Sequence, residues 1–145
     1  MKPEETIDYN IKICWHAISR MYNVQAAKHD ITTSIGFVLL NIDPQTGTPA
    51  TKIAPLLGLE ARSLTRILKT MEERGLIYKA ADPTDKRLVR IFLTELGLEK
   101  REVSRITVRQ FNQKVRELID EKELGCFFKV IGQINAAIES KEIFK

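Results

Sequence analysis

The stretch from Thr48 to Gly97 constrains the fold most, because several local patterns follow one another there without a gap. A short helix is predicted first, with Thr48 as its N-cap and Pro49 at its first position, where a missing N–H costs nothing. Leu57-Gly58-Leu59 closes this helix. Pro55 lies past the first turn and removes a backbone hydrogen bond, so a local bend is expected.

A second helix is predicted from Glu60 to Arg74. Its apolar residues recur at the three- and four-residue spacing of one helix face, and they are Leu64, Ile67, Leu68 and Met71. Polar and charged residues fall on the other side, and they are Arg62, Ser63, Thr65, Arg66, Lys69 and Glu73. Glu60 stands where a Ser, Thr or Asp cap is more usual, although its carboxylate still gains from the helix dipole. One face therefore packs into a core, and the other is free to contact a partner.

A charged hairpin follows the second helix. Gly75 is expected in a left-handed conformation, and residues 76–80 then change to a β-branched and aromatic run. Residues 82–87 have turn chemistry, and residues 88–93 return as a second strand. Helix, turn, helix and hairpin in this order predict a winged helix-turn-helix, with Lys86 and Arg87 at the tip of the wing.

The residues of the second helix and the wing suit contact with double-stranded DNA. Arginine can donate two hydrogen bonds to the O6 and N7 atoms of guanine, and serine and threonine can reach bases or phosphates. The predicted DNA-binding set is Arg62, Ser63, Thr65, Arg66, Lys69, Lys86 and Arg87. By spacing alone the cations of the helix are equally typical of a solvated face. Lys86 is favoured as the groove contact, whereas Arg87 either contacts DNA or pairs with Asp85 to brace the wing.

Long amphipathic helices are predicted at both ends of the chain. One covers about residues 3–28, a second begins after Thr94, and a third opens with a capping box at Asp120. Their apolar residues are Ile7, Ile11, Cys14, Trp15, Ile18 and Tyr22; Val103, Ile106, Phe111, Val115, Leu118 and Ile119; and Leu124, Phe127, Phe128, Ile131, Ile134 and Ile138. These stripes need partners, either within one chain or from a second copy. The predicted fold class is thus mainly α with a small β-hairpin wing.

Several motifs resemble the MarR family of bacterial transcription regulators. Residues 62–66 and 71–77 resemble its recognition helix and first wing strand, and Asp85-Lys86-Arg87 with residues 93–97 resembles its wing and exit signature. The resemblance runs from about Glu5 to Glu139. It implies one domain over 1–145, with a DNA-binding lobe at 32–93 and dimerisation helices at 1–31 and 94–145. It further implies a homodimer on a palindromic operator, released in many members by a phenolic or other anionic small molecule.

Composition agrees with this interpretation. The chain has 145 residues, a net charge of +4 and 43% hydrophobic residues, enough for one packed domain. Residues 60–90 hold eight lysines and arginines against five acidic residues, so most of the positive charge lies on the second helix and the wing. No secretion signal or apolar run of membrane-spanning length is present, so a cytoplasmic protein without membrane contact is expected.

Alternative functions rest on a few residues. Trp15, His16 and Tyr22 are the candidate residues for an effector pocket, although an aromatic stripe at this spacing is also typical of a core. Cys14 raises a thiol-based redox sensor as an alternative, but no cationic cluster accompanies it and buried packing is favoured. No metal site, cofactor or catalytic residue is predicted, so the chain is not expected to be an enzyme. A winged helix that docks protein is the other alternative, and it should carry an apolar or acidic face.

Overall fold

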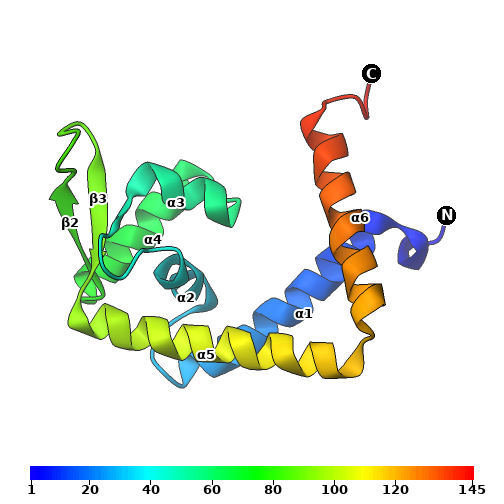
Figure 1. Ribbon diagram of the computed structural model, residues 1–145, viewed down its shortest axis with the longest axis horizontal. Helices are drawn as coiled ribbons and strands as arrows, with labels where there is room; N and C mark the ends of the chain where they lie inside the picture. The colour runs from blue at the N-terminus through cyan, green and yellow to red at the C-terminus, as the bar shows by residue number, and fades with distance from the viewer. The chain divides into compact units, whose positions relative to one another are not determined.

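The computed structural model describes residues 1–145 and is mainly α-helical, with one small antiparallel sheet (Figure 1). The helices are η1 (Pro3–Glu5), α1 (Ile7–Ala27), α2 (Thr33–Leu40), α3 (Ala50–Leu57), α4 (Ala61–Glu73), α5 (Glu95–Leu118) and α6 (Glu121–Glu139). The strands are β1 (Thr48–Pro49), β2 (Ile77–Ala81) and β3 (Val89–Leu93). The predicted fold class is confirmed. The chain divides into two compact units, Met1–Thr107 and Val108–Lys145, and each is described by itself.

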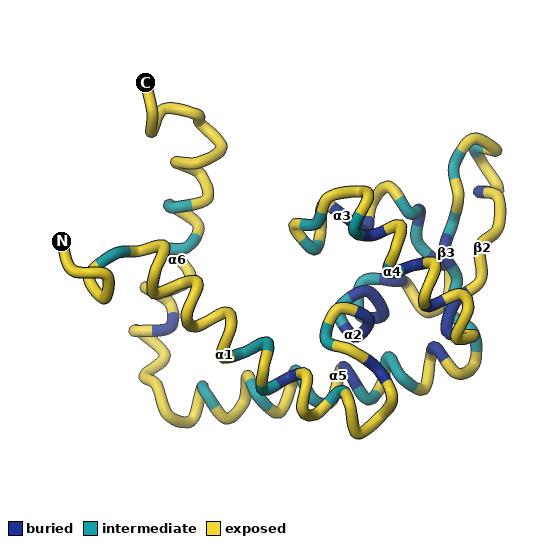
Figure 2. The backbone as a smooth tube through the Cα atoms, turned by 180° about the vertical axis from the view of Figure 1, so that it is seen from behind, coloured by how far each residue is buried: buried dark blue, intermediate teal, exposed yellow.

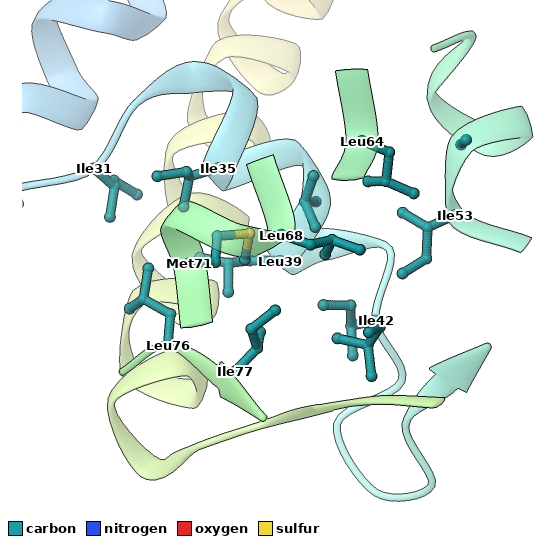
Figure 3. Close-up of a cluster of buried hydrophobic side chains, with 13 residues drawn as sticks. Ile31, Ile35, Leu39, Ile42, Ile53, Leu64, Leu68, Met71, Leu76 and Ile77 are labelled. Carbon is teal, nitrogen blue, oxygen red and sulfur yellow. The ribbon is translucent and has the colours of Figure 1, made fainter. Parts of the chain in front are cut away.

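The core of the first unit lies where α2, α3 and α4 meet the sheet. Figure 3 shows side chains from α2, α4 and β2 converging there, with the sulfur of Met71 among the aliphatic groups. Buried members of this cluster are Ile31, Ile35, Val38, Leu39, Ile42, Ile53, Ala54, Leu64, Leu68, Met71, Leu76, Ile77 and Ile91. The predicted apolar face of α4 is therefore confirmed, with Ile67 partly buried against the cluster. Because α4, β2 and β3 all contribute to this core, it fixes α4 and the hairpin relative to each other.

The sheet has the strand order β1-β3-β2, and all neighbouring strands are antiparallel. Thr48 pairs with Ile91 and Pro49 with Arg90, so these two residues belong to the sheet. The prediction of Thr48 as N-cap and Pro49 as first helical residue is thus wrong by one position, because α3 begins at Ala50 with Pro49 as its N-cap. The Thr48 hydroxyl instead accepts a hydrogen bond from the Asp43 N–H at 2.9 Å.

The predicted ends of α3 and α4 are confirmed. Gly58 caps α3 with φ 63° and Gly75 follows α4 with φ 73°, both in the left-handed region that favours glycine. Pro55 lies inside α3, two residues before its end, so the hydrogen bond that it lacks falls in the last turn. Glu60 is the N-cap of α4 and makes no side-chain capping hydrogen bond.

Most residues of α1 and α6 are exposed (Figure 2). They include most of the large apolar residues of the two helices. Tyr22 is the buried residue of α1, and Leu124 is the buried residue of α6. The expectation that Cys14 is buried is wrong, because the side of α1 that carries it is not covered within this chain. Asp120 is the N-cap of α6 as predicted, but its side chain makes no capping hydrogen bond. No helix combines the length and the hydropathy needed to cross a bilayer.

Candidate nucleic-acid interface

The face of α4 opposite the core carries three cations without partners. Arg62, Arg66 and Lys69 are exposed, and their side chains form no ion pair or hydrogen bond within the chain. At 3.6 residues per turn they lie one above another, on the side away from Leu64 and Leu68. We call Arg62, Ser63, Thr65, Arg66 and Lys69 the outer face of α4. The core orients this face, because Leu64 and Leu68 are each 4% exposed and cannot leave their sites without opening a cavity.

The two hydroxyl groups of the outer face differ in the hydrogen bonds that they can still form with a partner. Thr65 donates to the carbonyl of Ala61 at 2.9 Å, which leaves its oxygen as an acceptor. Ser63 is half-buried and makes no hydrogen bond, so its hydroxyl can donate or accept. A shallow hollow of about 260 Å³ runs beside it, lined by Ser63, Arg66, Ile67 and Thr70.

The wing stands beside α4, with β2 and β3 paired along their whole length (Figure 1). The buried carboxylate of Asp82 organises the turn at its tip. One oxygen, Oδ1, accepts from the Thr84 hydroxyl at 2.7 Å, from the Thr84 N–H at 2.9 Å and from the Asp85 N–H at 3.1 Å. These hydrogen bonds, with Arg90 as a further donor, hold the pKa of Asp82 well below its usual range. Asp82 is therefore ionised at neutral pH, and its hydrogen bonds stabilise the turn.

The two cations at the tip differ in their surroundings. Arg87 pairs with Asp85 in a two-point contact, Nε to Oδ1 at 3.1 Å and Nη2 to Oδ2 at 3.2 Å. This contact and the Arg87 N–H hold the pKa of Asp85 below its ordinary value. The Arg87 side chain is nevertheless 90% exposed, so it can still reach a partner. Lys86 is exposed and has no ion pair, in line with its predicted role as the groove contact.

Arg90 is a residue of the wing that the sequence analysis did not single out. Its Nε donates to Asp82 Oδ2 at 3.0 Å, and its Nη1 donates to the carbonyls of Thr46 at 3.0 Å and Gly47 at 3.1 Å. The side chain is 22% exposed. Of these contacts, only the one with Asp82 lies within the hairpin. It could have been predicted from the sequence, because the pairing of the two predicted strands brings Arg90 close to Asp82. The carbonyls lie more than forty residues away, beyond the reach of local patterns.

The residues proposed for an effector pocket lie on α1. Trp15 and Tyr22 both contact the ring of Phe37 on α2, with centroids 6.2 Å and 5.9 Å away. Tyr22 is buried, which raises the pKa of its phenol, whereas Trp15 is half-exposed. His16 is exposed and takes no part in this aromatic group. The structure therefore brings two of the three residues together.

Comparison with known proteins found a matching family model and similar regulators. Residues 31–89 match the model of the MarR family. The regulator TtmR of Methylorubrum extorquens is 37% identical over 82 residues, which are 57% of this chain and 42% of TtmR. The chain thus aligns with less than half of the length of that relative. TtmR is named as an HTH-type transcriptional regulator, which agrees with the prediction that the chain is not an enzyme.

Solved structures agree on the fold. A crystal structure of the S. aureus MepR-DNA complex matches with a TM-score of 0.83 at 22% identity, over 91% of this chain and 98% of that one. The PcaV transcriptional regulator of Streptomyces coelicolor, in complex with its natural ligand, matches with a TM-score of 0.81 at 20% identity, over 95% and 97% of the two chains. At this sequence identity the structural similarity supports the fold alone. The chemistry of the site has to be inferred from the residues of this chain.

Proposed function

We propose that the chain is a transcriptional regulator of the MarR family, whose model matches residues 31–89, and that it represses by binding a palindromic operator as a homodimer. The observation that carries the proposal is the outer face of α4. Arg62, Arg66 and Lys69 are exposed and unpaired there, next to a wing whose tip presents Lys86 and Arg87. A winged helix that docks protein should itself carry an apolar or acidic face, whereas this face is basic and polar. A duplex offers guanine edges to its arginines and phosphates to its lysines.

The roles of the two elements follow from their surroundings. The outer face of α4 enters the major groove, where Arg62 and Arg66 contact bases and Ser63, Thr65 and Lys69 contact bases or phosphates. The wing contacts the adjacent minor groove or its phosphates, with Lys86 free to bind and Arg87 held in place by Asp85. In this scheme residues 32–93 form the DNA-binding lobe of a single MarR-type domain over residues 1–145.

Dimerisation rests on residues 1–31 and 94–145. Large apolar side chains are exposed there, among them Ile7, Ile11, Ile13 and Trp15 on α1 and Phe127, Phe128 and Ile138 on α6. Burying apolar surface is worth about 25 cal/mol per Å², so an interface of the size typical of obligate dimers is strongly favourable. Two copies also supply two recognition helices, which a palindromic operator requires.

Control by a small molecule is a further part of the proposal. Trp15, His16 and Tyr22 supply aromatic and hydrogen-bonding groups suited to a phenolic or anionic effector. PcaV, whose fold this chain shares, was crystallised with its natural ligand. An effector bound beside α1 would release DNA by changing the spacing of the two recognition helices. We expect such a regulator to work in the cytoplasm, where its operator would be.

Selection from a random duplex pool tests the proposal. The full-length protein is expected to enrich an inverted repeat with half-sites about one helical turn apart, roughly 34–36 Å. Light scattering on the same sample should give the mass of a dimer, free and on one operator. The matched control is the double variant Arg62→Ala/Arg66→Ala, which should keep the dimer mass and enrich no motif. Enrichment of a single half-site, or preference for single strands, would contradict the proposal.

A further inference from the structure

The side chain of Arg90 joins the wing to the loop between α2 and β1. Arg90 lies on the central strand β3, between two neighbours with small or compact side chains, Ala80 on β2 and Pro49 on β1. Its guanidinium can therefore extend across the sheet without a bulky neighbour beside it. At one end it meets the carboxylate of Asp82, which is 3% exposed. At the other end it meets the carbonyls of Thr46 and Gly47.

The loop that receives Arg90 is itself held in place. The Asp43 carboxylate accepts from the N–H groups of Gln45 at 2.8 Å and Thr46 at 2.9 Å, and these hydrogen bonds lower its pKa. Gly47 has φ 69°, and a β-carbon there would lie 2.7 Å from the ring of Phe92 on β3. The loop thus lies directly against the wing strand, and its carbonyls are fixed acceptors for the guanidinium.

A continuous set of contacts runs from this loop to the tip of the wing. Arg90 donates to Oδ2 of Asp82, while Oδ1 of the same carboxylate accepts from the N–H groups of Thr84 and Asp85. Asp85 in turn pairs with Arg87. We propose that Arg90 is a positioning residue for DNA binding, which fixes the wing-tip cations relative to the α2–β1 loop without contacting DNA itself. The effect on DNA binding rests on the proposed function, whereas the effect on the structure of the wing and the loop rests on the geometry alone.

Three variants separate positioning from other roles. Arg90→Met removes both the charge and the hydrogen bonds while keeping most of the chain length. Arg90→Lys keeps a charge beside Asp82 but loses the planar fork that reaches both partners at once. Lys79→Met is the matched control, because Lys79 lies on the neighbouring strand and makes only an exposed ion pair with Glu72 at 3.8 Å.

Hydrogen exchange of the full-length protein without DNA is the first measurement. Both Arg90 variants should exchange faster in two segments, residues 43–47 and 82–88, while amides of the core helices keep their protection. Lys79→Met should match the wild type in both segments. Faster exchange throughout the molecule, or in the wing alone, would overturn the proposal, because Arg90 would then stabilise the fold in general or only the hairpin.

Binding of the selected operator is the second measurement, arranged as a double-mutant cycle with Lys86→Ala. In the wild type, loss of one phosphate-directed cation should weaken binding on the order of fivefold at 150 mM salt. In the Arg90→Lys background the same substitution should weaken binding less than twofold. Without the contacts of Arg90, the tip is no longer held where Lys86 meets the DNA, so less binding is lost with Lys86. An equal loss in both backgrounds would overturn the proposal. If the wild type binds no duplex, the proposed function fails, and hydrogen exchange alone decides the role of Arg90.

Discussion

The hydroxyl of Thr94 donates to the carbonyl of Gly75 at 2.6 Å and so joins the end of α4 to the start of α5. The same oxygen accepts from the Gly97 N–H at 3.0 Å, which is the hydrogen bond of a helix N-cap. The Thr94 N–H completes the junction by donating to the carbonyl of Leu76 at 3.1 Å. One side chain thus serves two helices, which gives a physical reason for the Leu-Thr-Glu-Leu-Gly sequence at the exit of the wing.

Removing the Thr94 hydroxyl should destabilise the first unit. Thr94→Ala loses the cap and leaves the Gly75 carbonyl without this donor, so the free energy of unfolding should fall by about 0.5–2 kcal/mol. Thr94→Ser is the control, because it keeps the hydroxyl and should stay closer to the wild type. Urea denaturation followed by circular dichroism measures both. Equal losses in the two variants would mean that the hydroxyl is not responsible.

A methyl group at Gly97 should be poorly tolerated. A β-carbon there would overlap the carbonyl oxygen of Leu76, which belongs to the backbone and cannot rotate away. Gly97→Ala should therefore cost roughly 1–3 kcal/mol, the usual range for overpacking. Gly132→Ala on α6 is the comparison, because no atom lies within 4 Å of its β-carbon and alanine favours a helix by about 0.5–1 kcal/mol. Thermal denaturation should shift in opposite directions for the two variants.

Asp82 should contribute to the acid sensitivity of the fold. Its pKa is lowered in the folded state, chiefly by the hydrogen bonds from Thr84, while a free aspartate titrates near about 3.9. The stabilisation is therefore fully present above about pH 5 and is lost as the pH falls below about 4. In Asp82→Asn, proton uptake on unfolding between pH 4 and 3 should fall by up to about one per molecule. Asp8→Asn, at an exposed carboxylate without an ion pair, is the control for the loss of one acidic side chain.

Arg62 and Arg66 should determine base preference. Alanine at either position removes a side chain that can donate two hydrogen bonds to guanine, so binding should weaken by about 1–3 kcal/mol and one position of the operator should become degenerate. Repeating the duplex selection with each variant measures both effects. A uniform loss across all sequences would instead assign the two arginines to phosphates.

Lys86 should act in a different way. A cation that meets phosphate or the narrow groove affects all sequences alike, so Lys86→Ala should leave the operator motif unchanged and reduce the salt dependence of binding by about one ion. Titrations at several salt concentrations give this slope. The division of labour between helix and wing would be wrong if Lys86→Ala relaxed the motif as strongly as Arg66→Ala.

The sequence predicted those parts of the fold whose signals are local. The α4 stripe, the end of α3 at Gly58, the left-handed Gly75 and the turn at Asp82 were all predicted from neighbouring residues and are present. Strand β1 was missed because two residues, one of them proline, have no strand pattern of their own and are held by pairing with β3.

Long-range contacts explain the remaining differences at the candidate site. The contact of Arg90 with Thr46 depends on how the α2–β1 loop folds back, and nothing in either segment encodes the other. Cys14 follows an apolar helical spacing, but spacing predicts only which side of α1 is apolar, whereas burial requires a surface to cover it. The cations of the outer face were predicted by type and spacing, and their lack of partners became visible only in three dimensions.

The unpaired cations of α4 also have a consequence for the free protein. Arg62 and Arg66 are four residues apart and Lys69 follows three later, so like charges face one another along the helix and each pair costs about 0.2–0.5 kcal/mol. Replacing one of them with glutamate would turn repulsion into attraction and make the isolated chain more stable. A glutamate on this face would also repel a polyanion. Under the proposed function, the present sequence therefore gives up some folding free energy for DNA binding.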